Sequence, residues 1–236
     1  MTIDDTKQAA RQRVWAALDR ADAVRPPGAA GHIPSFVGAE RAAHRLAELE
    51  AWQTAGVVKA NPDAAQLPVR EQALRENKLV YMAVPKIAKP LPFYLLDPAH
   101  VGAEAATSKR AAEVAPTVGP GTMRPVDLVV CGTVAVDHRG TRIGKGAGYS
   151  DIEVALLTEA GLIGPDTTIL TTVHQLQVVD EELPESAHDF SVDLIVTPDE
   201  VIECGPRRRP AGILWDHLDA SKIQAIPVLA ELYAKR

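Results

Sequence analysis

The stretches that decide the fold are DLVVCG (127–132), YSDIEVALLTEAG (149–161), TTILTTV (167–173) and DLIVT (193–197). The first, third and fourth are short apolar runs rich in β-branched residues, as buried strands are. The second has helical spacing and ends at Gly161. Strands that alternate with helices predict an α/β fold with a mostly parallel sheet covered on both faces.

The N-terminal half adds three expected helices and a strand. The apolar spacing predicts helices over 7–20, with Asp4 and Asp5 as N-cap residues, over 35–53, with Ser35 as the cap, and over 65–77. A strand is expected over 78–87. Residues 98–125 are weakly periodic and predict a surface excursion.

Composition narrows the classes of protein. The 236 residues are 46% apolar, enough for the core of one large domain, and the net charge of −6 argues against a broad nucleic-acid-binding surface. The two cysteines lie far apart, so no disulfide framework is expected. The chain shows no signal peptide and no run of eighteen apolar residues, so we expect a cytoplasmic protein without a membrane partner.

The densest chemical signal is the loop RGTRIGKGAGYSD (139–151), between an expected strand and an expected helix. Its three alternating glycines allow backbone N–H groups to approach an anion, and the helix beginning at Tyr149 adds a partial positive charge. Arg142 and Lys145 supply full charges. The spacing is not that of a Walker P-loop. A phosphate-binding loop and a simple glycine turn both remain open on spacing alone.

Two further groups of residues point to the same chemistry. Lys7, Arg11 and Trp15 are spaced to share one helix face, which can neutralise phosphates or be a solvated basic face beside a core tryptophan. Asp189 and Asp193 stand near the start of the last strand, where they can hold Mg²⁺, brace basic groups or shape a turn.

Other polar residues give weaker signals. His188 and His174 can be general bases or hydrogen-bonding loop residues. The run Arg207-Arg208-Arg209 is expected to be a solvated or self-paired surface segment.

Taken together, these motifs resemble the 5-formyltetrahydrofolate cyclo-ligase family, the methenyltetrahydrofolate synthetases. The family's loop, roughly G-x-R-L-G-x-G-x-G-Y-Y-D, is similar to residues 140–151. Its H-D-x-x-V-D-x-I-x-T run is matched over 188–197, and its N-terminal Lys and Arg by Lys7 and Arg11. The resemblance extends from residue 7 to about 203.

The resemblance implies a three-layer α/β/α sandwich of the sugar-phosphate isomerase and CoA transferase type, over 1–203, with the tail 204–236 packing on the same domain. It implies the ATP- and Mg²⁺-dependent closure of a reduced folate, 5-formyltetrahydrofolate, to 5,10-methenyltetrahydrofolate. In that reaction the γ-phosphoryl group activates the formyl oxygen as a leaving group, and N10 attacks the activated carbon. A monomer or homodimer is expected.

The resemblance also implies residue roles. The catalytic residues would be Arg142, Tyr149 and Asp151. The ATP phosphates would be held by Lys7, Arg11, Gly144, Lys145, Gly146, Ala147, Gly148 and Tyr149. The metal ligands would be Asp151, Asp189 and Asp193.

Three positions depart from the family pattern. Ser150 replaces the second tyrosine, Ile152 replaces a frequent basic residue, and Cys131-Gly132 stands where Pro-Gly is usual. The tail motifs GILW (212–215) and IPVL (226–229) resemble the divergent methenyltetrahydrofolate synthetase domain-containing branch. Two alternatives therefore stand beside the folate enzyme: a diverged nucleotide- or folate-binding regulatory protein, and an ATP-dependent enzyme for another formamide-like substrate.

Overall fold

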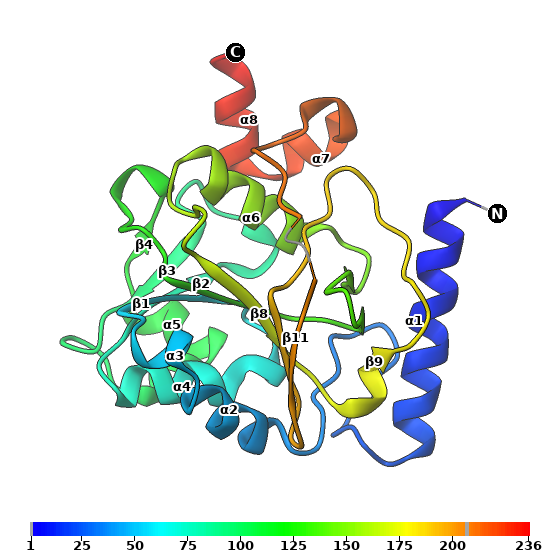
Figure 1. Ribbon diagram of the computed structural model, residues 1–236. Coiled ribbons are helices and arrows are strands. Elements are labelled where there is room, and N and C mark those ends of the chain that lie inside the picture. The colour runs from blue at the N-terminus through cyan, green and yellow to red at the C-terminus, as the bar shows by residue number, and fades with distance from the viewer. Residues whose placement is uncertain (1, 206–207) are drawn as a thin grey trace.

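The computed structural model describes residues 2–205 and 208–236, whose strands form an eight-stranded and a three-stranded sheet (Figure 1). The large sheet has the order β11-β10-β8-β5-β1-β2-β3-β4, and its five central strands are parallel. Its strands are β1 (Val57–Ala60), β2 (Leu79–Ala83), β3 (Phe93–Leu96), β4 (Thr117–Val118), β5 (Leu128–Cys131), β8 (Thr168–Thr172), β10 (Leu194–Val196) and β11 (Val201–Glu203). The small sheet joins β6 (Ala135–Asp137), β7 (Arg142–Ile143) and β9 (Val178–Val179).

Successive residues of the central strands enter two separate cores, because side chains alternate across a strand. Val58 and Val130 belong to one apolar cluster, and their neighbours Val57 and Val129 belong to the other. The sheet is therefore buried on both faces. The expectation of an α/β fold with a mostly parallel sheet is confirmed.

Helices cover both faces. The clusters place α2 and α4 on one face and α6, α7 and α8 on the other, and α1 lies along the edge formed by the small sheet (Figure 1). The α-helices are α1 (Ile3–Arg20), α2 (Ala39–Ala47), α3 (Glu50–Gln53), α4 (Leu67–Arg75), α5 (Ser108–Val114), α6 (Tyr149–Glu159), α7 (Ala220–Ala225) and α8 (Pro227–Ala234). Among the described residues, no helix has both the length and the apolar character needed to cross a membrane.

Helix starts and breaks differ from the sequence predictions. Thr2 is the N-cap of α1, and its side chain and Asp5 bond each other's backbone N–H groups, so the helix begins earlier than predicted. The helix expected over 35–53 is two helices, because Leu49 is extended (ψ 143°), and Gly38 rather than Ser35 takes the N-cap position.

The segment 98–125 is more ordered than its weak periodicity predicted. It contains α5 and the edge strand β4, and Ala105, Ala106 and Ala111 are fully buried in the core. Alanine contributes little to a periodicity analysis, yet it fits where a helix must approach a sheet closely. The prediction of a plain surface excursion was wrong here.

The described part of the tail 204–236 packs beside α6. Ile226 and Leu229 are almost completely buried in the same cluster as Leu157 of α6, and the backbone N–H of Ile213 donates to Glu159. Figure 1 shows α7 and α8 next to α6.

Charged side chains are also buried inside this fold. Lys59 of β1 and Glu153 of α6 form an ion pair with side-chain exposures of 0% and 4%. Lys59 also donates to Asn61 Oδ1 (3.0 Å). Burial raises the pKa of Glu153, and the Lys59 charge opposes that rise.

We expect Lys59→Met to destabilise the protein by about 3–5 kcal/mol, because it leaves the Glu153 carboxylate buried and uncompensated. Urea unfolding measures the loss. Lys235→Met removes the same charge from an exposed pair with Glu231 and should cost less than about 1 kcal/mol. Equal costs for the two variants would contradict the buried-pair interpretation.

Candidate functional site

A cavity of about 600 Å³ opens where three parallel strands end. Asn61 follows β1, Val84 follows β2 and Gly132 follows β5, and all three line the cavity. The carboxyl ends of parallel strands are the usual place for ligands in open α/β sheets. The volume lies within the range of small-molecule sites.

The glycine loop forms one wall of the cavity, between β7 and α6. Gly146 and Gly148 have φ angles of 100° and 69°, which side-chain-bearing residues rarely adopt. A Cβ atom on Gly144 would lie 2.8 Å from Nη2 of Arg142, so a side chain here would force the guanidinium to shift. The loop places the N-terminus of α6 at the cavity, where its unpaired N–H groups favour an anion.

Arg142 is held at the cavity wall by groups from three elements. Its Nη1 donates to Asp151 Oδ1 (3.1 Å) and its Nη2 to the Gly132 carbonyl oxygen (3.3 Å), and its guanidinium lies 4.6 Å from the centre of the Phe190 ring. The side chain is 2% exposed. Its Nε has no hydrogen-bond partner among the residues that the structure describes.

Lys7 and Arg11 reach the same wall from one face of α1. Lys7 pairs with Asp189 and donates to Ser186 Oγ, and Arg11 Nε donates to the Gly144 carbonyl oxygen (2.7 Å). Burial lowers the pKa of Arg11, and the nearby charge of Arg142 lowers it further. An anion at this wall would relieve that repulsion.

Trp15 does not line the cavity. It packs in the core, 8% exposed, and its Nε1 donates to the His32 carbonyl oxygen. The interpretation of this position as a core tryptophan is therefore the correct one, and the cationic face of α1 consists of Lys7 and Arg11.

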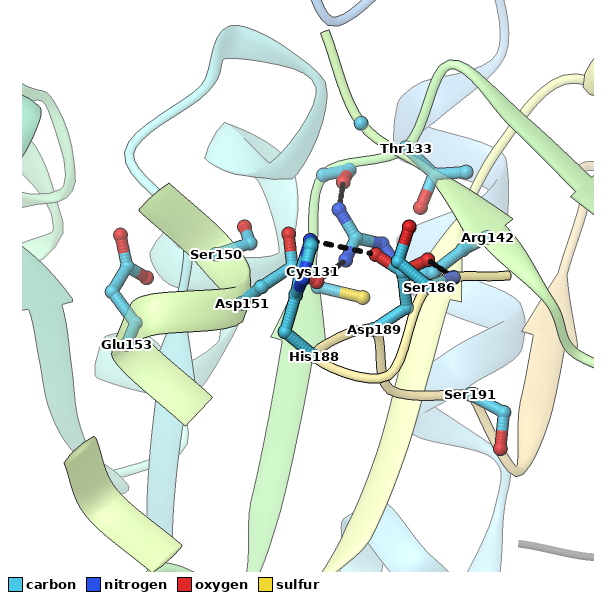
Figure 2. A network of polar contacts seen from close by, with 12 residues as sticks. Cys131, Thr133, Arg142, Ser150, Asp151, Glu153, Ser186, His188, Asp189 and Ser191 are labelled. Atoms are coloured by element: carbon cyan, nitrogen blue, oxygen red, sulfur yellow. Dashed lines mark hydrogen bonds and ion pairs between the residues drawn. The ribbon is translucent and has the colours of Figure 1, made fainter. Parts of the chain in front are cut away.

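Two of the three predicted metal ligands meet in the cavity. Figure 2 shows Asp151, at the start of α6, and Asp189, in the loop before β10, gathered around Arg142. Burial raises the pKa of Asp151; Arg142 opposes the rise and Asp189 adds to it. The described residues contain no cluster of three or more metal-ligating side chains. Mg²⁺ commonly takes one or two carboxylates together with substrate phosphates. The pair fits a metal shared with a ligand, not one caged by protein.

Asp193, the third predicted metal ligand, does not lie at the cavity, so this prediction was wrong. Its Oδ2 accepts a hydrogen bond from the backbone N–H of Ile169 (2.8 Å) and pairs with Arg209, and the residue is not part of the cavity lining. It joins β8, β10 and the C-terminal segment. Of the predicted arginine run, Arg208 likewise pairs with Glu185, and Arg207 lies outside the described residues.

The remaining predicted residues differ in exposure. Lys145 has a 44% exposed side chain, 3.9 Å from Asp63 Oδ1, and projects from the loop. Ala147 and Tyr149 line the cavity with their glycine neighbours. His188 also lines it, whereas His174 caps a short helical turn by accepting the N–H of Leu176.

Another part of the cavity wall contains residues that the sequence analysis missed. They come from the turn after β1, the turn after β2 and the start of α5: Asn61, Asp63, Lys86 and Ser108. The signal for the first two was the turn NPD, directly after an apolar run that forms a parallel strand.

Buried Arg70 of α4 holds that turn in place through hydrogen bonds to its backbone. It donates to the carbonyl oxygens of Asn61, Asp63 (3.0 Å) and Ala106 (2.8 Å). Burial lowers its pKa to about 10.

Ser150, where the family pattern has a tyrosine, is tied into this wall. Asn61 Nδ2 donates to Ser150 Oγ (2.6 Å), and Asn61 Oδ1 accepts from Lys59. The ion pair between Lys59 and Glu153 completes the network. The position therefore carries a hydrogen-bonded hydroxyl in place of a ring.

Comparisons with known proteins agree with this architecture. Methenyltetrahydrofolate synthase domain-containing proteins of Mus musculus and Homo sapiens are 37% and 34% identical, over 96% and 98% of this chain. The chain spans 63% and 62% of their lengths. The NMR structure of Aquifex aeolicus 5,10-methenyltetrahydrofolate synthetase aligns with a TM-score of 0.56 at 21% identity, covering 92% of this chain and 100% of that one, and so shares the fold.

The sequence model of the 5-formyltetrahydrofolate cyclo-ligase family matches residues 3–198, which include every cavity-lining residue described above. The chain belongs to the 5-formyltetrahydrofolate cyclo-ligase family.

Proposed function

We propose that this protein closes 5-formyltetrahydrofolate to 5,10-methenyltetrahydrofolate at the expense of ATP, in the cavity at the ends of β1, β2 and β5. The observation that carries the proposal is the convergence of Lys7, Arg11 and Arg142 with the glycine loop on one cavity wall. Cationic side chains and backbone N–H groups of this kind are the groups that bind the phosphates of a nucleotide. Such reactions depend mainly on positioning and charge stabilisation.

The chain's own groups would act on the transferred phosphoryl group. A formyl oxygen leaves readily only once it is phosphorylated, so negative charge must be moved and neutralised beside the substrate. Arg142 is already fixed by Asp151 and Gly132, so it would need no reorganisation during the reaction. Arg11 lies against Gly146 of the loop, its Cζ 3.4 Å from where a Cβ would stand, and would share the charge.

Asp151 and Asp189 would hold Mg²⁺ together with the phosphates. Asp189 raises the pKa of Asp151, so a cation beside both carboxylates would lower their repulsion. The bound ion would supply charge neutralisation and orient the phosphates. Lys7, which pairs with Asp189, would keep that carboxylate in place.

A second candidate function is a nucleotide- or folate-binding protein with a regulatory use. One observation favours it: Tyr149 is the one Phe, Tyr or Trp ring among the described lining residues of the cavity. Ser150 supplies a hydroxyl where the family pattern has another ring. Less stacking surface would weaken the hold on a pterin while leaving the phosphate wall intact. An ATP-dependent enzyme acting on another formamide would share that wall.

With Mg²⁺ and ATP, we expect the protein to convert 5-formyltetrahydrofolate to 5,10-methenyltetrahydrofolate. The growth of methenyltetrahydrofolate absorbance and the release of ADP measure the reaction. Omission of ATP or addition of a chelator serves as the control. ADP release with another formamide alone would keep the mechanism and discard the folate. Folded protein that binds MgATP but turns over neither substrate would support the regulatory alternative.

We expect Arg142→Ala to raise the Kd for MgATP about 10- to 100-fold, because it removes a charge-assisted contact worth about 1.5–3 kcal/mol. Calorimetric titration measures the change. Arg110→Ala, on the exposed side of α5 and paired with Glu113, removes the same charge away from the cavity and should leave the Kd unchanged. Equal effects of the two substitutions would show that the phosphate wall is misplaced.

A further inference from the structure

The C-terminal segment 204–236 touches the glycine loop from outside the cavity. It lies beyond the residues that the family model matches, whereas the alignments with the curated relatives cover at least 96% of the chain and so include most of it. The segment is anchored beside α6 by the buried side chains of Ile226 and Leu229. Helix α7 lies near the N-terminus of α6, where the glycine loop ends.

Lys222 of α7 makes two contacts with the loop. Its Nζ donates a hydrogen bond to the Ala147 carbonyl oxygen (2.6 Å), and the same atom lies 4.1 Å from the centre of the Tyr149 ring. Asp219 caps α7 by accepting the backbone N–H of Lys222 (2.6 Å), which fixes the start of the helix that carries the lysine. The contact is therefore built from a capped, anchored helix.

The hydrogen bond from Lys222 fixes the orientation of the peptide group between Ala147 and Gly148. In a trans peptide the C=O and the following N–H point in opposite directions. Because the Ala147 carbonyl is turned toward Lys222, the N–H of Gly148 faces away from α7. Gly148 lines the cavity and is the N-cap residue of α6. A glycine pair with positive φ on either side of Ala147 allows this peptide to rotate, so something must fix it.

The charge of Lys222 also remains available to the loop. Its contacts are a carbonyl oxygen and a ring, and among the described residues no carboxylate forms an ion pair with it. Burial lowers the pKa of Lys222, and the charge of Asp219, at the start of the same helix, opposes that shift. A lysine that is not neutralised, beside a phosphate-binding loop, adds to the attraction for an anion.

The segment reaches a second part of the cavity wall. His217 lies in the 3-10 turn Trp215–His217, and its ring centre is 5.7 Å from that of His188, a lining residue. The two rings meet edge to face, with their Nδ1 atoms 3.5 Å apart. The segment therefore braces the glycine loop through Lys222 and the loop containing Asp189 through His217.

We propose that Lys222 is a positioning residue for the glycine loop, through which the C-terminal segment sets the affinity of the cavity for a phosphate chain. The inference rests on the phosphate site of the proposed function and adds a residue from outside the family-matched region. Lys222 acts through the Ala147 peptide and Tyr149, and it does not itself line the cavity.

The test compares Lys222→Met, Lys222→Arg and Lys235→Met in the full chain. Calorimetry in the presence of Mg²⁺ measures the Kd for MgATP and for inorganic tripolyphosphate, and thermal unfolding without ligand measures stability. We expect Lys222→Met to raise both Kd values about tenfold, the loss of one charge-assisted hydrogen bond. Lys222→Arg, which keeps a donor and the charge, should restore most of the affinity. Lys235→Met, in an exposed pair on α8, should match the wild type.

Hydrogen exchange provides a readout independent of ligand. Peptides covering 144–149 should exchange faster in Lys222→Met than in the wild type, while peptides covering β1 and β5 keep their rates. Unchanged exchange in the loop together with unchanged Kd values would overturn the inference. So would a loss of affinity that Lys222→Arg reproduces in full, accompanied by an equal loss of stability.

Ligand binding by the wild type separates failure of the phosphate site from failure of the role of Lys222. Wild-type protein that binds neither MgATP nor tripolyphosphate would overturn the phosphate site and this inference with it. Wild-type protein that binds both, with Lys222→Met binding equally well, would overturn the role of Lys222 alone and leave the proposed function standing.

Discussion

The buried guanidinium of Arg142 is the constraint on which the site depends. Removing a guanidinium from water costs several kcal/mol unless its donors are paired. Here Asp151 of α6 accepts a hydrogen bond from Nη1, the Gly132 carbonyl after β5 accepts one from Nη2, and the guanidinium lies against the Phe190 ring. The pairing ties together the sheet, the glycine loop and α6. The loop also passes close to the charge, because a Cβ atom on Gly144 would lie 2.8 Å from Nη2 of Arg142. The cavity therefore has a fixed positive group before any ligand arrives.

The parts of this site that follow local rules were predictable from the sequence. Lys7 and Arg11 share a helix face through i, i+4 spacing, and the glycines of 144–148 stand between a strand and a helix. Asp193 was misassigned because the five residues from Asp189 pass through an irregular loop, in which spacing does not determine direction. In the structure Asp193 accepts a hydrogen bond from the backbone of β8 and does not line the cavity. Residues after β1 and β2 were missed because the sheet order that brings them to the glycine loop is a property of the whole chain.

The two walls of the cavity are constrained differently. The wall that would hold phosphates consists of the glycine loop with Lys7, Arg11 and Arg142, and these cations contact the loop backbone or its neighbours. The wall formed by the turn after β1 depends on a hydrogen-bonded chain from Ser150 through Asn61 to the buried pair of Lys59 and Glu153. A substitution at position 150 thus changes more than the stacking surface, because its hydroxyl accepts the Asn61 amide that also orients Lys59. Substitutions at this wall can change which substrate fits while the wall that would hold phosphates stays the same. Family membership therefore establishes the fold more firmly than the folate substrate.

The net charge of the lining decides in what form a phosphate ligand can enter. Five basic side chains line the cavity among the described residues: Lys7, Arg11, Lys86, Arg142 and Lys145. Five acidic side chains line it as well: Asp4, Asp63, Asp151, Glu153 and Asp189. The formal charges cancel, so the cavity is polarised rather than uniformly positive, and a bare triphosphate would meet repulsion from Asp151 and Asp189 wherever it met attraction from Arg142. A divalent cation carried by the phosphates reverses the sign of that contact, because the carboxylates then face a cation. The same two carboxylates that hold Arg142 and Lys7 in place would therefore favour a metal-bound nucleotide over the free one.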